Sequence, residues 1–264
     1  MGLGWAPVSL FGMTTQQKRA TMSRIAVISD IHSNLQALEA VWARIDELDI
    51  EQIFCLGDIV GYGAKPAECL GKIRAAGVRC VQGNHDALVA DGNQNLDFNI
   101  YSLAAVEHNR PLLSQDDLQW LGNLPTSLRL DENALFVHGA PDDRDRYLIY
   151  LDDLQDASAR IFEEDGPGVC FFGHTHHPVV FDGQGFVPVR QKQIFLDDTL
   201  RMLVNPGSVG QPRDNDPRAS FAWLDRAENV LTFERVEYDI LAARQDIFDA
   251  GLPRVLGDRL LEGR

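Results

Sequence analysis

The chain has 264 residues, of which 45% are hydrophobic and 24% are charged, and its formal net charge is −15. A chain of this length and composition can bury the core of one large α/β domain. The negative charge argues against a long nucleic acid as a partner, because binding a phosphate backbone normally requires a basic surface. No stretch approaches the roughly 18 apolar residues needed to span a bilayer, so no membrane association is expected.

Residues 1–22 are expected to be an N-terminal extension that is poorly ordered or packs loosely. They carry no cationic residue before Lys18 and no convincing small-residue cleavage site, so they make a poor signal peptide. Met22 stands just before the first predicted strand, which is consistent with a start assigned too far upstream or with an added segment. Residues 23–264 are expected to form a single domain.

Cysteine usage indicates a reducing compartment. No two cysteines form a C-x-x-C pair, and three of the four lie inside apolar runs, where a thiol serves as a small core hydrophobe. A cytoplasmic location is therefore predicted, without a cysteine zinc site. The four cysteines are Cys55, Cys69, Cys80 and Cys170.

The first part of the chain alternates short apolar runs with amphipathic segments, which predicts a βαβαβ order. The sequence Ser33-x-x-Gln36 resembles a capping box that opens the first helix. Pro66 and Gly77 mark the start and the end of the second helix. The predicted strands are 24–29, 52–56 and 78–82, and the second predicted helix is 66–76.

Residues 87–127 are predicted to form a small helical insertion, in which Ser114 begins a second helix. The segment is either a cap beside the site or a simple helical crossover, and the pattern slightly favours the crossover. After it, strands separated by turns become common, with a hairpin expected at Asp182-Gly183. The other predicted elements are strands 134–137, 169–172, 220–224 and 230–236, and helices 154–163 and 239–261, the last interrupted near Gly251 and Pro253.

Together these elements predict an α/β fold, with a mixed sheet in a two-sheet sandwich flanked by helices. Exposed strands late in the chain could support a homodimer.

Five short polar segments, each directly after an apolar run, carry the functional signal. They contain five of the seven histidines, together with aspartates and one asparagine. Open α/β sheets place their ligands at the carboxyl ends of strands, so these side chains are expected to converge as a ligand set for two metal ions. The segments are Asp30-Ile31-His32, Gly57-Asp58, Gly83-Asn84-His85-Asp86, His138-Gly139 and Gly173-His174-Thr175-His176.

Each segment alone also has an ordinary structural explanation. An aspartate such as Asp58 after a strand often caps a helix, and His138 could be a hydrogen-bonded core histidine. His174 and His176 are harder to explain by packing, because two imidazoles two residues apart on an extended chain suit metal ligation. The joint occurrence of all five segments at strand ends favours the metal site.

In this order, the five segments resemble the motifs of the calcineurin-like metallophosphoesterase superfamily, and the resemblance covers roughly residues 25–222. Segments 57–63 and 205–213 further resemble a bacterial and archaeal branch of phosphoesterases related to diadenosine tetraphosphatases. The resemblance implies a metallophosphoesterase-type two-sheet α/β sandwich. It also implies hydrolysis of a phosphodiester or a nucleotide phosphoanhydride by a hydroxide that bridges two metals.

The resemblance assigns a ligand set in which the Asp58 carboxylate bridges the two ions. Mixed nitrogen and oxygen ligands favour Mn²⁺, Fe or Zn²⁺ over Ca²⁺ or Mg²⁺ alone. The implied ligands are Asp30, His32, Asp58 and His176 for one ion, and Asp58, Asn84, His138 and His174 for the other.

Further residues around these motifs are candidates for catalysis and substrate binding. By the resemblance, His85 is a non-ligand catalytic histidine that stabilises the transition state or protonates the leaving oxygen. Asp86 is a second catalytic candidate that orients His85 or neighbouring groups, or it only caps the following helix. Arg213 either binds a substrate phosphate or forms a surface salt bridge. The remaining substrate-binding candidates are Asn84, Asn34 and Tyr62.

Two alternatives concern the activity itself. Phosphoprotein phosphatases of this superfamily carry Gly-Asp-x-x-Asp-Arg-Gly, whereas segment 57–63 lacks the second Asp and the Arg, so phosphoprotein hydrolysis loses weight and a phosphomonoester remains open. A non-catalytic scaffold on the same fold would be expected to lose ligands, but all seven are present. The expected partner is a small phosphorylated substrate, with nucleotides among the candidates.

Overall fold

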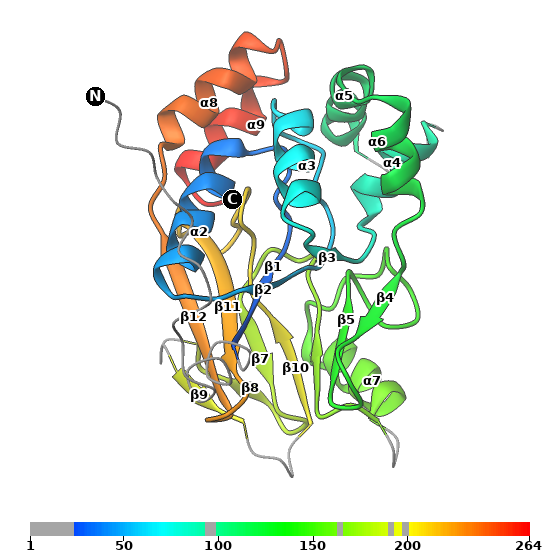
Figure 1. Cartoon of the computed structure of the whole chain (residues 1–264), viewed down its shortest axis with the longest axis vertical. Coiled ribbons are helices and arrows are strands. Elements are labelled where there is room, and N and C mark those ends of the chain that lie inside the picture. Colours follow the sequence, from blue (N-terminus) through cyan, green and yellow to red (C-terminus); the bar gives the residue numbers. More distant parts are fainter. Residues whose placement is uncertain (1–23, 93–98, 163–165, 190–192, 197–200) are drawn as a thin grey trace, which may run out of the picture.

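The computed structural model describes residues 24–92, 99–162, 166–189, 193–196 and 201–264. Two six-stranded mixed sheets pack against each other, and helices cover their outer faces (Figure 1). The predicted α/β sandwich flanked by helices is therefore confirmed. The predicted N-terminal extension lies outside the described residues. Within the described part of the chain, no helix combines the length and the apolar character needed to cross a membrane.

The first sheet combines the three predicted parallel strands with antiparallel strands from late in the chain. Its strands are β1 (Arg24–Ile28), β2 (Gln52–Cys55), β3 (Arg79–Cys80), β9 (Gln193–Phe195), β11 (Ala219–Asp225) and β12 (Val230–Val236). They lie in the order β3-β2-β1-β11-β12-β9, with β1, β2 and β3 parallel and β11 antiparallel to β1. This confirms the predicted βαβαβ order, although β3 is shorter than predicted.

The second sheet is formed entirely by the middle of the chain. Its strands are β4 (Ser127–Arg129), β5 (Ala134–Val137), β6 (Val169–Phe171), β7 (Val179–Phe181), β8 (Phe186–Val187) and β10 (Met202–Asn205). They lie in the order β4-β5-β6-β10-β7-β8, with β5, β6 and β10 parallel. The predicted hairpin at Asp182-Gly183 is confirmed as the β7–β8 turn, in which Asp182 accepts backbone hydrogen bonds from Gln184 and Gly185.

The helices follow the predicted segments with small shifts at their ends. They are α2 (Leu35–Glu47), α3 (Pro66–Ala75), α4 (Asn84–Asp91), α5 (Ile100–Asn109), α6 (Gln115–Gly122), α7 (Leu151–Ile161), α8 (Ile240–Asp249) and α9 (Arg254–Asp258), with 3₁₀ turns η2 (Arg110–Leu112) and η3 (Arg259–Leu261). The predicted end of α7 at Glu163 lies outside the described residues. The expected break between α8 and α9 is confirmed.

One capping prediction is wrong. The residue that caps α2 is Asn34 rather than Ser33, because the Asn34 side chain accepts a hydrogen bond from the backbone N–H of Ala37. The hydroxyl of Ser33 instead donates to Asn109 on α5, 2.8 Å away. Ser114 does cap α6, as predicted, and forms a capping box with Asp117.

The segment predicted as a helical insertion contains most of α4, which begins inside a polar motif, together with α5, η2 and α6. Its apolar side chains Leu88, Val106 and Leu121 join the same buried cluster as Leu38 of α2 and Ile28 of β1. Helices α4, α5 and α6 therefore extend the helical layer over the first sheet, beside α3 (Figure 1).

A stack of three phenylalanine rings joins the two sheets. Phe54 of β2 lies 4.1 Å from Phe136 of β5, and Phe136 lies 5.3 Å from Phe171 of β6, measured between ring centroids. All three side chains are buried in the cluster that fills the space between the sheets. On the far face of the second sheet, Leu154 and Ala157 of α7 complete a separate cluster.

Replacing Phe136 by alanine is expected to lower the free energy of unfolding by about 3–5 kcal/mol, because it leaves a cavity between two rings that cannot collapse onto each other. Urea denaturation followed by circular dichroism measures the change. Phe195→Ala is the matched control, since that ring is 75% exposed, and its effect should stay within about 0.5 kcal/mol. Equal effects of the two substitutions would contradict the central role of the stack.

Candidate metal centre

Seven polar side chains converge where the carboxyl ends of strands from both sheets meet. Asp30, Asp58 and Asn84 follow β1, β2 and β3 of the first sheet, and His138 and His174 follow β5 and β6 of the second. His32 and His176 lie two residues further on. All seven side chains are buried. The structure thus brings together the full set that the sequence predicts as ligands.

Asp30, His32 and His176 form the first group. The Nε2 atoms of His32 and His176 are 3.1 Å apart, and the Asp30 Oδ1 atom lies 3.3 Å from His176 Nε2 and 3.9 Å from His32 Nε2. Their ligand atoms are close enough to hold one ion between them.

Asp58, His138 and His174 form a second group, beside which Asn84 lies with its Oδ1 atom 3.0 Å from His138 Nε2. The Asp58 Oδ2 atom is 3.5 Å from His138 Nε2 and 3.6 Å from His32 Nε2. One carboxylate oxygen therefore lies between the two groups, where it can serve ions in both.

Backbone carbonyls fix the orientation of three imidazoles. The Nδ1 atoms of His32, His138 and His176 lie 3.2, 2.7 and 2.5 Å from the carbonyl oxygens of Val60, Leu56 and Gln211. Because a carbonyl only accepts, each neutral ring carries its proton on Nδ1 and presents an Nε2 lone pair to the centre.

These lone pairs and carboxylates require a positive charge between them. In the first group two Nε2 acceptors face each other beside Asp30 Oδ1, a buried oxygen that accepts no hydrogen bond from any described residue. Protonation does not relieve this arrangement, because burial lowers the pKa of both His32 and His176. In the second group, the Asp58 charge raises the pKa of His138 to about 9 in spite of burial. The donor set therefore fits metal cations.

His174 presents a different nitrogen. Its Nε2 atom lies 3.2 Å from the carbonyl oxygen of Asp145, so the neutral ring turns the Nδ1 lone pair to the centre. The Tyr147 ring stacks on the outer face of His174, 3.8 Å away between centroids. Burial lowers the pKa of His174 to about 3, which keeps the ring neutral and able to bind a metal.

The ligand-bearing loops adopt a backbone conformation that side-chain-bearing residues seldom use. Asp30, His32, Asp58, His174 and His176 all have positive φ, between 48° and 65°. Such strain persists only where the surroundings determine it, and it concentrates at functional sites. Here backbone hydrogen bonds join two of the loops. The N–H of Asp30 donates to the carbonyl of Gly57, and the N–H of His32 donates to the carbonyl of Asp58.

Two glycines allow the Asp58 loop and the following motif to approach each other. A Cβ atom on Gly57, which has φ +94°, would collide with the backbone of Gly83, and a Cβ on Gly83 would collide with Asp58. The close approach puts the N–H of His85 within 2.8 Å of Asp58 Oδ1. Both glycines are therefore needed to place the shared carboxylate.

Asp86 holds this same loop from beneath. Its carboxylate accepts hydrogen bonds from the backbone N–H groups of Asp58, Ile59, Val60 and Gly83, at 2.8–3.2 Å. Burial, together with the Asp58 charge, raises its pKa to about 7. The structure thus shows Asp86 both capping α4 and positioning the Asp58 loop, and it acts through these backbone groups.

His85 is buried beside His32 and Asp58. Its ring packs against Tyr62 and His32, with centroids 4.5 and 4.9 Å apart, and burial lowers its pKa to about 4. One of its ligand atoms also lies within reach of Asp58 and His32. Geometry alone therefore allows His85 to be a catalytic group or an additional ligand.

The other substrate-binding candidates occupy different surroundings. Both ends of the Asn34 amide are engaged, since it caps α2 and donates to the carbonyl of Gly210, 2.8 Å away. The Tyr62 hydroxyl bonds with Ser102 at 2.9 Å. Arg213 lies over the Tyr62 ring, 5.8 Å from its centroid, and no carboxylate among the described residues lies within 4.0 Å of it, so it forms no surface salt bridge there.

Residues that the sequence did not single out hold these loops in place. Asn109 of α5 is fully buried and bonds with Ser33, the N–H of Gly61 and the carbonyl of Gly63. Asn205 donates to the carbonyl of Gly173 and to Thr175. The sequence signal for Asn109 is its place on the same helix face as Ala105 and Val106, whereas Asn205 opens the segment that resembles the family motif.

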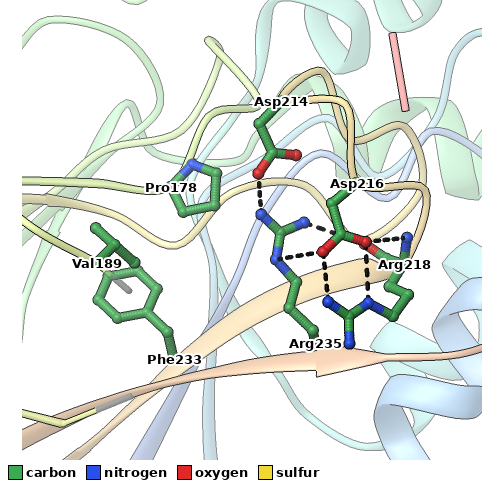
Figure 2. A pocket seen from close by; sticks show the side chains of 7 residues that line it. All are labelled: Pro178, Val189, Asp214, Asp216, Arg218, Phe233 and Arg235. Carbon is green, nitrogen blue, oxygen red and sulfur yellow. Dashed lines mark hydrogen bonds and ion pairs between the residues drawn. The ribbon is translucent and has the colours of Figure 1, made fainter. Parts of the chain in front are cut away.

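A separate pocket of about 410 Å³ is lined by residues between Pro178 and Arg235, all of which follow the site segments in the sequence. None of the seven candidate ligands lines this pocket. Figure 2 shows that its charges are paired with one another: Arg235 with Asp214 and Asp216, and Arg218 with Asp216. Because these groups neutralise each other, the pocket does not replace the buried centre as the candidate site.

The family follows from a match to the model of the calcineurin-like phosphoesterase superfamily domain, which spans residues 23–229. The chain belongs to this superfamily. This confirms the resemblance drawn from the motifs, and the matched region contains all seven candidate ligands.

Relatives with similar sequences or structures cover almost the whole chain. The uncharacterized protein MJ0912 of Methanocaldococcus jannaschii is 41% identical over 252 residues, covering 92% of this chain and 99% of its own. A metallophosphoesterase from Sphaerobacter thermophilus is 37% identical with a TM-score of 0.78, covering 92% and 99%. The hypothetical protein PH1004 of Pyrococcus horikoshii shares the fold at a TM-score of 0.76 and 23% identity, covering 91% and 98%.

Replacing Asp86 by asparagine is expected to destabilise the protein by about 1.5–3 kcal/mol, because an amide offers one acceptor where the carboxylate bonds four N–H groups. Metal affinity should fall about 10–100-fold, as for other groups that orient ligands. Urea denaturation and metal titration measure the two effects.

Asp153→Asn is the matched control for this substitution. Asp153 also accepts capping N–H groups, from Ile149 and Tyr150, but it belongs to α7. Its replacement should cost less than about 1 kcal/mol and leave metal affinity unchanged. Unchanged metal affinity in Asp86→Asn would show that the carboxylate only caps α4.

Proposed function

We propose that this chain is a phosphoesterase that uses two metal ions, Mn²⁺, Fe or Zn²⁺, to hydrolyse a phosphodiester or a nucleotide phosphoanhydride. The observation that carries the proposal is the position of Asp58, whose Oδ2 atom lies about equally far from His138 and His32 of the two groups. A carboxylate in this position can bridge two cations. The family match supports phosphoester chemistry, and the two ligand groups support metal binding.

When bound, two such ions supply an acidified water as nucleophile and neutralise charge on the phosphoryl oxygens. The residues of the chain then have distinct tasks. The backbone carbonyls of Val60, Leu56 and Gln211 keep three imidazoles in the tautomer that binds metal. Asn84 adds a neutral oxygen beside His138.

His85 is placed to act on the leaving group. Its backbone N–H is fixed on Asp58 and its ring is confined by Tyr62, so the imidazole keeps one direction. An imidazole held in this way can donate a proton to the leaving oxygen or stabilise its charge, which typically contributes about 10²–10⁴-fold to the rate.

The substrate class follows from charge and from the departure from the phosphatase motif. A net charge of −15 disfavours long polyanions but does not exclude a small phosphorylated molecule. Segment 57–63 lacks the acid and the arginine of phosphoprotein phosphatases and has Tyr62 instead, packed on His85. A phosphomonoester is the second candidate substrate.

The direct test is hydrolysis by metal-stripped protein refilled with Mn²⁺, using bis-p-nitrophenyl phosphate, p-nitrophenyl phosphate and diadenosine tetraphosphate. Metal-dependent turnover is expected, and Asp58→Asn should lose both ions and nearly all activity. Asp49→Asn is a matched control, because Asp49 is an exposed aspartate with nearly the same φ, 53° against 54°. Metal content is measured by atomic emission. Substantial turnover by Asp58→Asn would refute the bridging role, and no turnover with metal bound would favour a scaffold.

Replacing His85 by alanine should preserve both ions and slow hydrolysis about 10²–10⁴-fold. The loss should be larger for substrates with poor leaving groups, because these depend most on a proton donor. Rates for a series of aryl phosphates, with metal content measured in parallel, distinguish proton donation by His85 from metal ligation by His85. His108→Ala, on the partly exposed side of α5, should change neither. Loss of metal in His85→Ala would instead identify His85 as a ligand.

A further inference from the structure

Two arginines from distant parts of the chain meet beside the metal centre. Arg213 follows the loop after β10, and Arg259 begins the last 3₁₀ turn. Both guanidinium groups reach the same acceptor, the Gln211 side-chain oxygen, from which Arg213 Nη2 lies 2.9 Å and Arg259 Nη1 lies 3.4 Å away. A single neutral oxygen thus holds two positive charges side by side.

Neither arginine is neutralised within the part of the chain that the structure describes. No carboxylate there lies within 4.0 Å of either guanidinium, and the Nε–H of each is buried without a hydrogen-bond acceptor. Arg218 and Arg235, a few residues away along the chain, show the usual arrangement, because both are paired with aspartates (Figure 2). In a protein with a net charge of −15, two adjacent unpaired arginines indicate a place kept for an anion.

The arginine pair lies at the edge of the metal centre nearest His176 and His85. Gln211, which holds the pair, also accepts the Nδ1 proton of His176 through its backbone carbonyl. Arg213 covers the Tyr62 ring, and that ring packs directly on His85.

The packing of the C-terminal helices positions Arg259 beside Arg213. Leu256 and Leu260, on either side of it, pack in one buried cluster with Ala243 of α8 and with Tyr62 itself. Helices α8 and α9 are therefore packed on Tyr62, in the loop that follows Asp58. This packing fixes the Arg259 backbone beside the arginine from the earlier loop.

We propose that Arg213 and Arg259 together bind a second phosphate of the substrate, so that the substrate is a phosphoanhydride rather than a lone phosphomonoester. This rests on the proposed phosphoesterase function, in which the metal centre takes the first phosphate. Two guanidinium groups together offer enough N–H donors to bind several oxygens of one phosphate dianion. A single salt bridge would not require a second guanidinium group.

The pair also explains how the leaving group is stabilised. Hydrolysis joins the water oxygen to the attacked phosphorus and breaks the bond from that phosphorus to the bridging oxygen. The electron pair of the broken bond stays on the departing phosphate, and the protons of the water pass to the product phosphates and the solvent. The negative charge that develops on the departing phosphate lies next to the two guanidinium groups.

The test compares binding of orthophosphate and of methylenediphosphonate, a diphosphate mimic that cannot be hydrolysed, to Mn²⁺-loaded protein by titration calorimetry. Metal content is measured before and after, so that stripping is recognised. The unmodified protein should bind the diphosphonate at least about tenfold more tightly than orthophosphate, as expected for added charge-assisted hydrogen bonds. Arg259→Ala should remove this preference and Arg259→Lys should restore part of it.

Arg254→Ala is the matched control. Arg254 begins the same short helix α9 but stacks on Phe248, 4.1 Å from its ring centroid, so its loss should leave the preference unchanged. An unchanged preference in Arg259→Ala, or no preference in the unmodified protein, would overturn the inference.

The same protein distinguishes this failure from failure of the proposed function. Metal-dependent hydrolysis of p-nitrophenyl phosphate without any preference for the diphosphonate overturns the arginine site alone. If the protein prefers the diphosphonate through Arg259 but hydrolyses none of the three substrates named above, the phosphoesterase proposal alone is overturned.

Discussion

The structure depends on holding buried carboxylates and imidazoles close together, although only His138 among the four candidate ligand histidines has a raised pKa. Asp30 and Asp58 are carboxylates with almost no exposure, and neutral imidazoles turn their lone pairs toward them. Such a cluster opposes folding by several kcal/mol per uncompensated charge. Hydrogen bonds between side chains and the backbone of the loops offset this cost. Asp86, Asn109 and Asn205 bond the loops to one another, so that the acceptors cannot separate.

Elements with a strong local signal were predictable from the sequence. Strand β5 is a short apolar run and β12 is rich in β-branched and aromatic residues, and the bounds of both match the prediction. By contrast, β4 was not predicted, because Ser127–Arg129 is a mostly polar edge strand whose pairing with β5 is a tertiary contact. The misplaced cap of α2 has a similar cause, since Ser33 and Asn34 are both good caps and only the contact of Ser33 with Asn109 separates them.

The candidate ligands were also predictable, because their residue types recur at strand ends in one chain order. Among the residues that position them, Asp86 was predicted, but Asn109 and Arg259 were not. Asn109 lies on a helix, where a polar side chain ordinarily faces solvent, and its partners on the 33 and 61–63 loops come from far away in the chain. Arg259 is separated from Gln211 by 48 residues and reaches it only because α8 and α9 pack on Tyr62. Local patterns carry no information about such meetings.

The charges form two shells with opposite signs. The inner shell, built around Asp30 and Asp58, attracts cations, and the outer pair Arg213 and Arg259 attracts anions. The overall charge of −15 repels long polyanions from a distance, whereas a small anion that enters within a Debye length responds to the local arginines and to bound metal. An acidic protein can therefore select a compact phosphorylated substrate over a nucleic acid. The attraction of Arg213 and Arg259 acts only close to the metal centre, whereas the net negative charge acts on the whole of a long polyanion.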